Sequence, residues 1–118
     1  MKLLIVDDSL LMRKAVERSL AVKNYTLVGS AADGEEAMRI FKENLPDLVT
    51  LDITMPKMDG FACLIEMRKL KKDAKILMIT SQTDKYTAEE AMEKGASGVL
   101  GKPFSSAQLL EKVNEIMG

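Results

Sequence analysis

The hydrophobic pattern of this chain changes its period repeatedly. Short, nearly continuous apolar runs alternate with longer stretches in which apolar residues recur every three or four positions. The short runs are typical of strands buried in a parallel sheet, and the longer stretches are typical of helices with one apolar face. The predicted strands are 2–6, 26–31, 48–52, 75–80 and 98–102, and the predicted helices cover 10–20 and 84–94 and begin near residues 33, 59 and 105.

Local signals mark several helix ends. Residues 33–36 have the form of a capping box, as do Ser105 and Gln108, and Pro46 prevents the second helix from continuing. The apolar faces of the five helices are expected to contain Leu11, Ala15, Val16 and Leu20; Ala37, Ile40 and Phe41; Cys63, Leu64 and Met67; Ala88, Ala91 and Met92; and Leu109, Leu110, Val113 and Ile116.

Five consecutive strand–helix units predict one α/β domain over residues 1–118, with helices on both faces of a parallel sheet. Right-handed crossovers leave few possible strand orders. We expect the flavodoxin-like, doubly wound five-stranded sheet of order 2-1-3-4-5 with five helices, in which the first and third strands are neighbours at the point where the order reverses.

Four of these strands end on polar residues that suit phosphoryl chemistry, namely Asp7-Asp8, Asp52, Thr80 and Lys102. The carboxyl ends of parallel strands share one edge of the sheet, so these side chains are expected to meet there. Three carboxylates can hold Mg²⁺, a carboxylate can accept a phosphoryl group, and a lysine can neutralise phosphate charge. Without metal, mutual repulsion should raise the pKa of at least one of these carboxyl groups.

Composition narrows the chemistry further. The chain contains no histidine and one cysteine, which excludes His-based catalysis and a Cys/His zinc site on this chain. With 17 basic and 18 acidic residues it has no basic field for nucleic acid, and no apolar run is long enough to span a membrane. The start of the chain enters a strand directly, without a signal-peptide pattern, and a single cysteine suits a reducing compartment, so a cytoplasmic protein is expected.

These motifs are similar to those of one family. The chain resembles a response-regulator receiver domain of the CheY type over essentially all 118 residues. The matching positions are Asp7-Asp8, Asp52, Met55-Pro56, Asp59-Gly60, Thr80, Gly95-Ala96 and Lys102-Pro103-Phe104.

The resemblance implies a role for each site residue. Asp52 would be the phosphoacceptor, with Thr80 and Lys102 holding the phosphoryl oxygens. Mg²⁺ would be bound by Asp8 directly, by Asp7 largely through water, by Asp52, and by the backbone carbonyl of Thr54. The Lys102–Pro103 bond would be cis.

The resemblance also implies partners. They are a histidine kinase and a downstream protein bound through the face formed by the fourth helix, fifth strand and fifth helix. A phosphatase is a further candidate partner, and no nucleic acid or membrane is expected. The protein is expected to be a monomer and to catalyse only its own phosphorylation and dephosphorylation. One position departs from the family, because Val99 stands where many receivers carry Tyr or Phe as the switching partner of Thr80.

Other interpretations stay open at this stage. Asp7-Asp8 could be helix-capping residues, Thr80 could cap a turn, and Lys102 could be a solvated strand end. The chain could also be the isolated receiver of a longer regulator, a receiver-like module that is never phosphorylated, or a flavin carrier, although 4% aromatic content without tryptophan disfavours the last. A haloacid-dehalogenase-type phosphatase would need a second Asp two positions after Asp52, where Thr54 stands.

Overall fold

The computed structural model describes all residues, 1–118, as one sheet of five strands with five helices. The strands are β1 (Lys2–Val6), β2 (Thr26–Ala31), β3 (Leu48–Asp52), β4 (Lys75–Thr80) and β5 (Gly98–Gly101). The helices are α1 (Leu10–Leu20), α2 (Gly34–Asn44), α3 (Gly60–Leu70), α4 (Lys85–Glu93) and α5 (Ser106–Met117).

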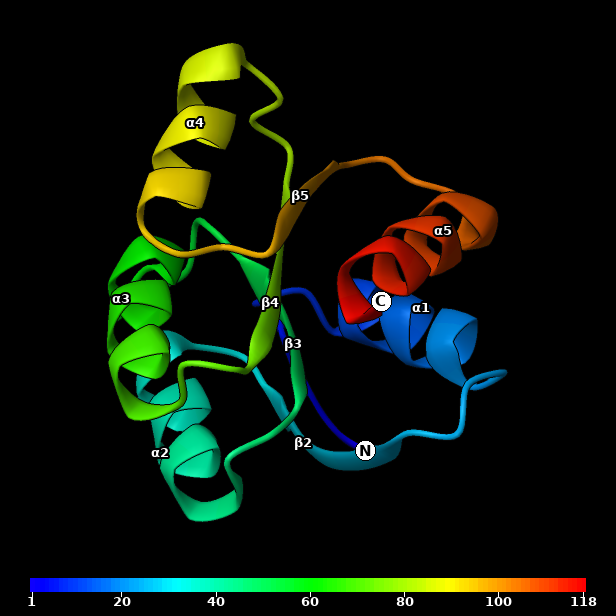
Figure 1. Ribbon diagram of the computed structural model, residues 1–118, viewed down its shortest axis with the longest axis horizontal. Coiled ribbons are helices and arrows are strands. Elements are labelled where there is room, and N and C mark those ends of the chain that lie inside the picture. The colour runs from blue at the N-terminus through cyan, green and yellow to red at the C-terminus, as the bar shows by residue number, and fades with distance from the viewer.

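All strand pairs are parallel and the sheet order is β2-β1-β3-β4-β5, as predicted. Helices α2, α3 and α4 lie on one face of the sheet, and α1 and α5 lie on the other (Figure 1). The chain adds β2 on one side of β1 and then crosses to the other side of β1 to form β3, so the strand order reverses between β1 and β3. Val6 is paired with Leu51 at this point, so Asp7 and Asp52 follow directly on neighbouring strands.

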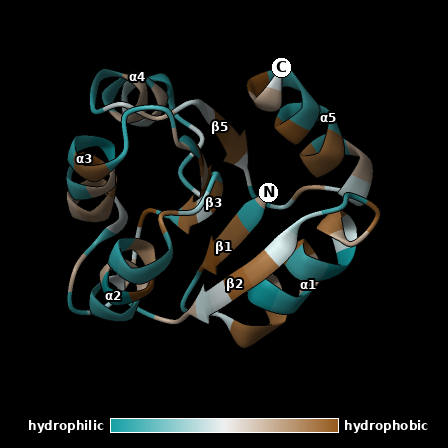
Figure 2. Cartoon of the chain, turned by 60° about the horizontal axis from the view of Figure 1, so that its bottom comes forward, coloured by the Kyte–Doolittle hydropathy of each residue, from teal (hydrophilic) through white to brown (hydrophobic).

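The sheet separates two layers of apolar side chains. One layer of 19 buried residues lies between the sheet and helices α2–α4, and another of nine lies under α1 and α5. Hydrophobic residues are concentrated in β1, while the helices show polar and apolar sides (Figure 2). Because the central strands are covered on both faces, they read as continuous apolar runs in the sequence.

Helix starts follow the predicted capping residues, although only one bond of the box predicted at residues 33–36 is present. The Asp33 carboxylate accepts a hydrogen bond from the Glu36 backbone N–H at 2.9 Å. Ser105 and Gln108 form both bonds of a capping box. These caps satisfy backbone N–H groups that have no partner within the helix.

Two predictions of core residues are wrong. Leu11 is 80% exposed and Met92 is 50% exposed. The buried stripe of α1 is centred on Val16 and Leu20, and Leu11 lies outside it. In α4 only Ala91 is fully buried, because this helix covers the edge of the sheet beside the short strand β5 rather than its middle.

Strand β5 ends at Gly101, one residue earlier than predicted, which places Lys102 in the following loop. The Lys102–Pro103 peptide bond is cis, as the resemblance implied. None of the five helices combines the length and apolar character needed to cross a bilayer.

Candidate phosphoryl and metal site

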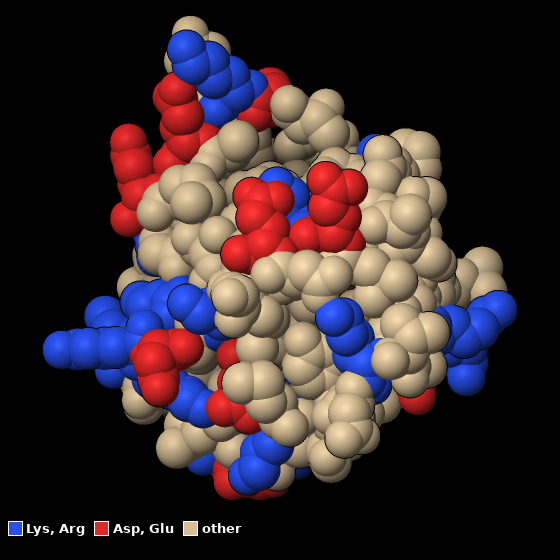
Figure 3. Space-filling view, turned by 45° about the vertical axis from the view of Figure 1, so that its right-hand side comes forward, with Lys and Arg blue, Asp and Glu red and all other residues tan.

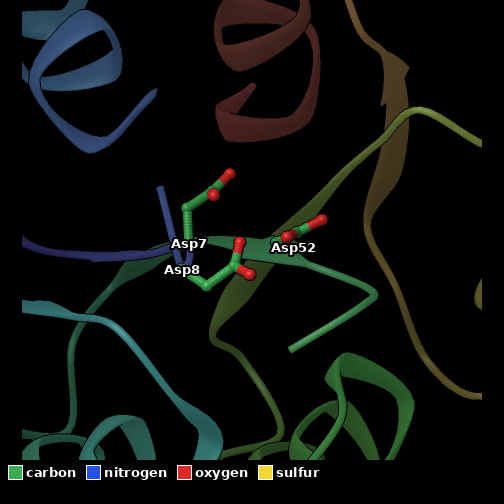
Figure 4. Close-up of side chains that lie close together, drawn as sticks. All are labelled: Asp7, Asp8 and Asp52. Carbon is green, nitrogen blue, oxygen red and sulfur yellow. The ribbon is translucent and has the colours of Figure 1, made fainter. Parts of the chain in front are cut away.

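The three predicted aspartates meet at the carboxyl edge of the sheet. Carboxylate oxygens of Asp7, Asp8 and Asp52 all lie within 4.8 Å of one another. Asp7 and Asp8 follow β1 and Asp52 ends β3, which Figure 4 shows from close by. The cluster therefore arises from the strand order, since β1 and β3 are neighbours in the sheet but not consecutive in sequence.

Asp7 is a fixed part of the site. It is 3% exposed, and one carboxylate oxygen accepts a hydrogen bond from the Ser9 backbone N–H at 2.9 Å. Its other carboxylate oxygen lies 2.8 Å from the Lys102 ammonium group. Its backbone N–H donates to the Ala31 carbonyl oxygen of β2 at 3.0 Å. With both oxygens engaged, this carboxylate is held in one orientation.

Lys102 points into the cluster from the loop after β5. Its Nζ is closer to Asp7, at 2.8 Å, than to Asp52, at 3.6 Å. The backbone N–H of Lys102 donates to the Thr80 carbonyl oxygen, which anchors the loop to β4. The alternative interpretation, that this lysine is a solvated strand end, is therefore wrong, because its ammonium group is the cation of the site.

Figure 3 shows one face of the molecule where acidic side chains gather around a partly covered basic side chain among uncharged residues. The three aspartates and Lys102 form such a cluster, in which acidic side chains surround one basic side chain. Three negative charges face one positive charge in the cluster, so the cluster carries a net negative charge at neutral pH.

This arrangement of charges shifts the pKa of Asp52. Burial raises its pKa above the ordinary value, and the negative charge of Asp7 raises it further. The positive charge of Lys102 lowers the pKa, and Asp8 adds a smaller upward contribution. The expected pKa increase at one of the three carboxyl groups is thus confirmed, and the residue concerned is the predicted phosphoacceptor.

The residues present fit a hard divalent cation. Asp8 is exposed, and none of the hydrogen bonds or ion pairs of the site involves its side chain. A free carboxylate beside two others supplies the oxygen ligands that Mg²⁺ prefers, with open positions for water and phosphate. The donor set contains no nitrogen or sulfur ligand that would favour zinc or copper.

Thr80 and Thr54 lie at the same edge of the sheet as this cluster, since Thr80 follows Ile79, which is paired with Asp52. Thr80 ends β4, is 2% exposed, and its hydroxyl oxygen accepts a hydrogen bond from the Gln82 backbone N–H at 2.9 Å. This bond ties the Thr80 side chain to the loop that leads into α4. Thr54 is exposed two residues after Asp52, and the role of its carbonyl as a metal ligand stays a prediction.

A glycine fixes the loop after Asp52. The Gly60 backbone N–H donates to the Ile53 carbonyl oxygen at 2.7 Å. A Cβ atom at Gly60 would lie 2.1 Å from the Asp52 carbonyl oxygen. Only glycine allows α3 to begin this close to the end of β3, so the Asp59-Gly60 pair serves the position of Asp52.

Sequence reasoning missed one residue that contacts the site. Nη1 of Arg13 in α1 donates to the Asp7 carbonyl oxygen at 2.6 Å. Helical spacing could have placed Arg13 in the first turn after the two acids, but its direction depends on how α1 packs against the sheet.

Comparisons with known proteins agree with this geometry. The family model described as the response regulator receiver domain matches residues 3–114. The chain is 35% identical over 116 residues to the chemotaxis protein CheY of Bacillus subtilis, covering 98% of this chain and 97% of that protein. It is 39% identical over 117 residues to protein CcdB of the same organism, covering 99% of this chain and 98% of CcdB.

A solved structure is similar over the whole chain. It belongs to the CheX–CheY–BeF₃–Mg²⁺ complex from Borrelia burgdorferi, with a TM-score of 0.95, 35% identity, and coverage of 100% of this chain and 90% of the other. The family model, the relatives and the shared fold lead to one conclusion. The chain belongs to the response regulator receiver family, the phosphate-accepting components of two-component signalling.

Proposed function

We propose that Asp52 accepts a phosphoryl group from the phosphohistidine of a histidine kinase in a reaction that depends on Mg²⁺. The single observation that carries this proposal is the cluster of three carboxylates within 4.8 Å, with the Lys102 ammonium group 3.6 Å from Asp52. Mg²⁺ supplies charge neutralisation for the phosphoryl oxygens when it is bound.

The chemistry of the step balances with the groups present. A carboxylate oxygen of Asp52 forms a bond to phosphorus while the bond from phosphorus to the donor's imidazole nitrogen breaks, and that nitrogen leaves with the electron pair. Lys102 is placed to stabilise negative charge on the transferred group. Asp8, Asp7 and Asp52 would hold the cation, with the Thr54 carbonyl as a further ligand.

We further propose that the switch is read through the loop after β4. The Thr80 hydroxyl accepts a hydrogen bond from the Gln82 N–H and keeps its own O–H free to donate to a phosphoryl oxygen on Asp52, so a shift of the hydroxyl toward that oxygen draws the Gln82 backbone with it. Val99 packs against the larger core layer and has no aromatic ring to rotate. Phosphorylation therefore acts on residues 81–84 and α4, and through them on partner binding at the α4-β5-α5 face.

The test is phosphorylation by acetyl phosphate with Mg²⁺, measured by intact-protein mass. The wild type should gain one phosphoryl group, Asp52→Asn should gain none, and Asp73→Asn should behave as wild type because Asp73 is exposed and outside the site. An equal adduct on Asp52→Asn would contradict the assignment. Steady turnover of phosphate esters would instead favour the phosphatase alternative, since a receiver acts only on its own phosphoryl group.

A further inference from the structure

Arg13 is the one basic side chain that contacts the site from α1. It lies in the first turn of the helix, which begins at Leu10 and is capped by Ser9. Its Nη1 donates to the backbone carbonyl oxygen of Asp7 at 2.6 Å in a partly buried bond. Hydrogen bonds from a charged donor are stronger than those between neutral groups, so this contact restrains the backbone at the end of β1.

The carbonyl of Asp7 belongs to the peptide that joins Asp7 to Asp8. The N–H and carboxylate of Asp7 are held by Ala31, Ser9 and Lys102. The Arg13 bond occupies the remaining polar atom of Asp7, its carbonyl oxygen. The Asp8 side chain has no such restraint of its own, so its direction depends on the peptide that carries it.

The geometry points to Arg13 as a positioning residue for the metal site: by holding the Asp7 carbonyl, it fixes the Asp7–Asp8 peptide so that the Asp8 carboxylate faces Asp52. This inference rests on the proposed function, because it concerns the same three carboxylates. Arg13 touches neither the cation nor the phosphoryl group in this scheme and acts through the backbone of Asp7.

A second observation concerns the rest of the Arg13 guanidinium group. The Nε of Arg13 is buried and has no hydrogen-bond partner. An unpaired buried N–H opposes stability, so a residue selected only for packing would be better served by an apolar side chain. One arm of the same guanidinium group reaches the Asp7 carbonyl, so the Asp7 contact is the hydrogen bond that this buried group makes.

The experiment compares Arg13→Met and Arg13→Gln with wild type, and uses Arg18→Met as a matched control. Arg18 is an exposed arginine of the same helix, so its loss removes the same charge without touching Asp7. Mg²⁺ affinity is measured by calorimetry. The Mg²⁺ dependence of phosphorylation by acetyl phosphate is measured on the same samples, and denaturant melts in EDTA report the structural contribution separately.

We expect both Arg13 variants to bind Mg²⁺ about tenfold more weakly, the lower end of the effect of removing a residue that orients a metal ligand. The half-saturating Mg²⁺ concentration for phosphorylation should rise by a similar factor, while the rate at saturating Mg²⁺ stays within about threefold of wild type. Arg18→Met should stay within about twofold in both measurements, as expected for an exposed charge far from the ligands.

A purely structural Arg13 would lower the denaturation midpoint without moving the Mg²⁺ affinity of the folded protein. Affinity within about twofold of wild type in whichever Arg13 variant is folded would overturn the inference. If wild type itself bound no Mg²⁺ and accepted no phosphoryl group, the proposed function would fail as well. If wild type did both and the Arg13 variants matched it, only the role of Arg13 would fail.

Discussion

Replacing Asp52 by Asn should stabilise the metal-free protein. Asp52 is 7% exposed, and burial together with the charges of Asp7 and Asp8 opposes its ionised form. Asparagine has nearly the same shape and carries no charge, so the substitution removes repulsion without opening a cavity. The same change removes the phosphoacceptor, so the expected gain in stability is accompanied by a loss of function.

The magnitude follows from the distances. At an effective dielectric constant of about 20, two unit charges at 4.8 Å, the upper limit of the separations in the cluster, repel by about 3.5 kcal/mol. Asp52 experiences two such interactions, and Lys102 at 3.6 Å offsets them by about 4.6 kcal/mol. Roughly 2 kcal/mol of repulsion remains, to which burial adds, so we expect a gain of about 1–3 kcal/mol in the free energy of unfolding.

The assay is urea denaturation of both proteins in EDTA at neutral pH, with Asp73→Asn as a control for loss of one acidic charge. The exposed control should change the free energy of unfolding by less than about 0.5 kcal/mol. Mg²⁺ should raise the melting temperature of wild type more than that of Asp52→Asn, because it binds the native cluster.

Acidification gives a second check with a defined sign. The folded-state pKa of Asp52 is raised, so its contribution favours folding below the unfolded-state pKa and is lost as pH rises through the folded-state pKa. The stability advantage of Asp52→Asn should therefore be full at neutral pH and shrink as pH falls through the raised pKa. If the variant is clearly less stable than wild type in EDTA at neutral pH, Lys102 already neutralises the pocket and the repulsion argument is wrong.

Three further outcomes can be measured in the same way. Arg68→Ala should lower the free energy of unfolding by about 2–3 kcal/mol, because its guanidinium donates to the carbonyls of Lys72, Ala74 and Gly95 and so joins the ends of α3 and α4; urea melts check this. Asp47→Asn should lower the free energy of unfolding at neutral pH, because a hydrogen bond from the Lys2 backbone N–H stabilises the ionised carboxylate and lowers the pKa of Asp47. Melts at several pH values should show the stability difference between variant and wild type disappearing as pH falls through that lowered pKa. Cys63 should resist a thiol reagent until the protein unfolds, since burial raises its pKa to about 12; labelling across a urea series checks this.

Features that depend on neighbours along the chain could be predicted from the residues alone. Apolar runs located the five strands, because buried parallel strands need apolar residues on both faces. Capping residues such as Asp33 and Ser105 located helix starts, because their side chains bond backbone groups only three residues away. With the strand order, these local signals were enough to predict that Asp7, Asp8 and Asp52 meet.

Features that depend on which way a side chain points across the fold required the three-dimensional packing. The exposure of Leu11 and Met92 follows from which side of each helix contacts the sheet, and helical periodicity alone left that rotation open. Likewise, Lys102 sits closer to Asp7 than to Asp52, and Arg13 reaches the Asp7 carbonyl. Electrostatic interactions vary with separation and burial on the scale of a few ångströms. Sequence spacing could therefore place these charges at one edge of the sheet, but it could not say which groups would pair. The packing of α1 and of the loop after β5 decided the pairing.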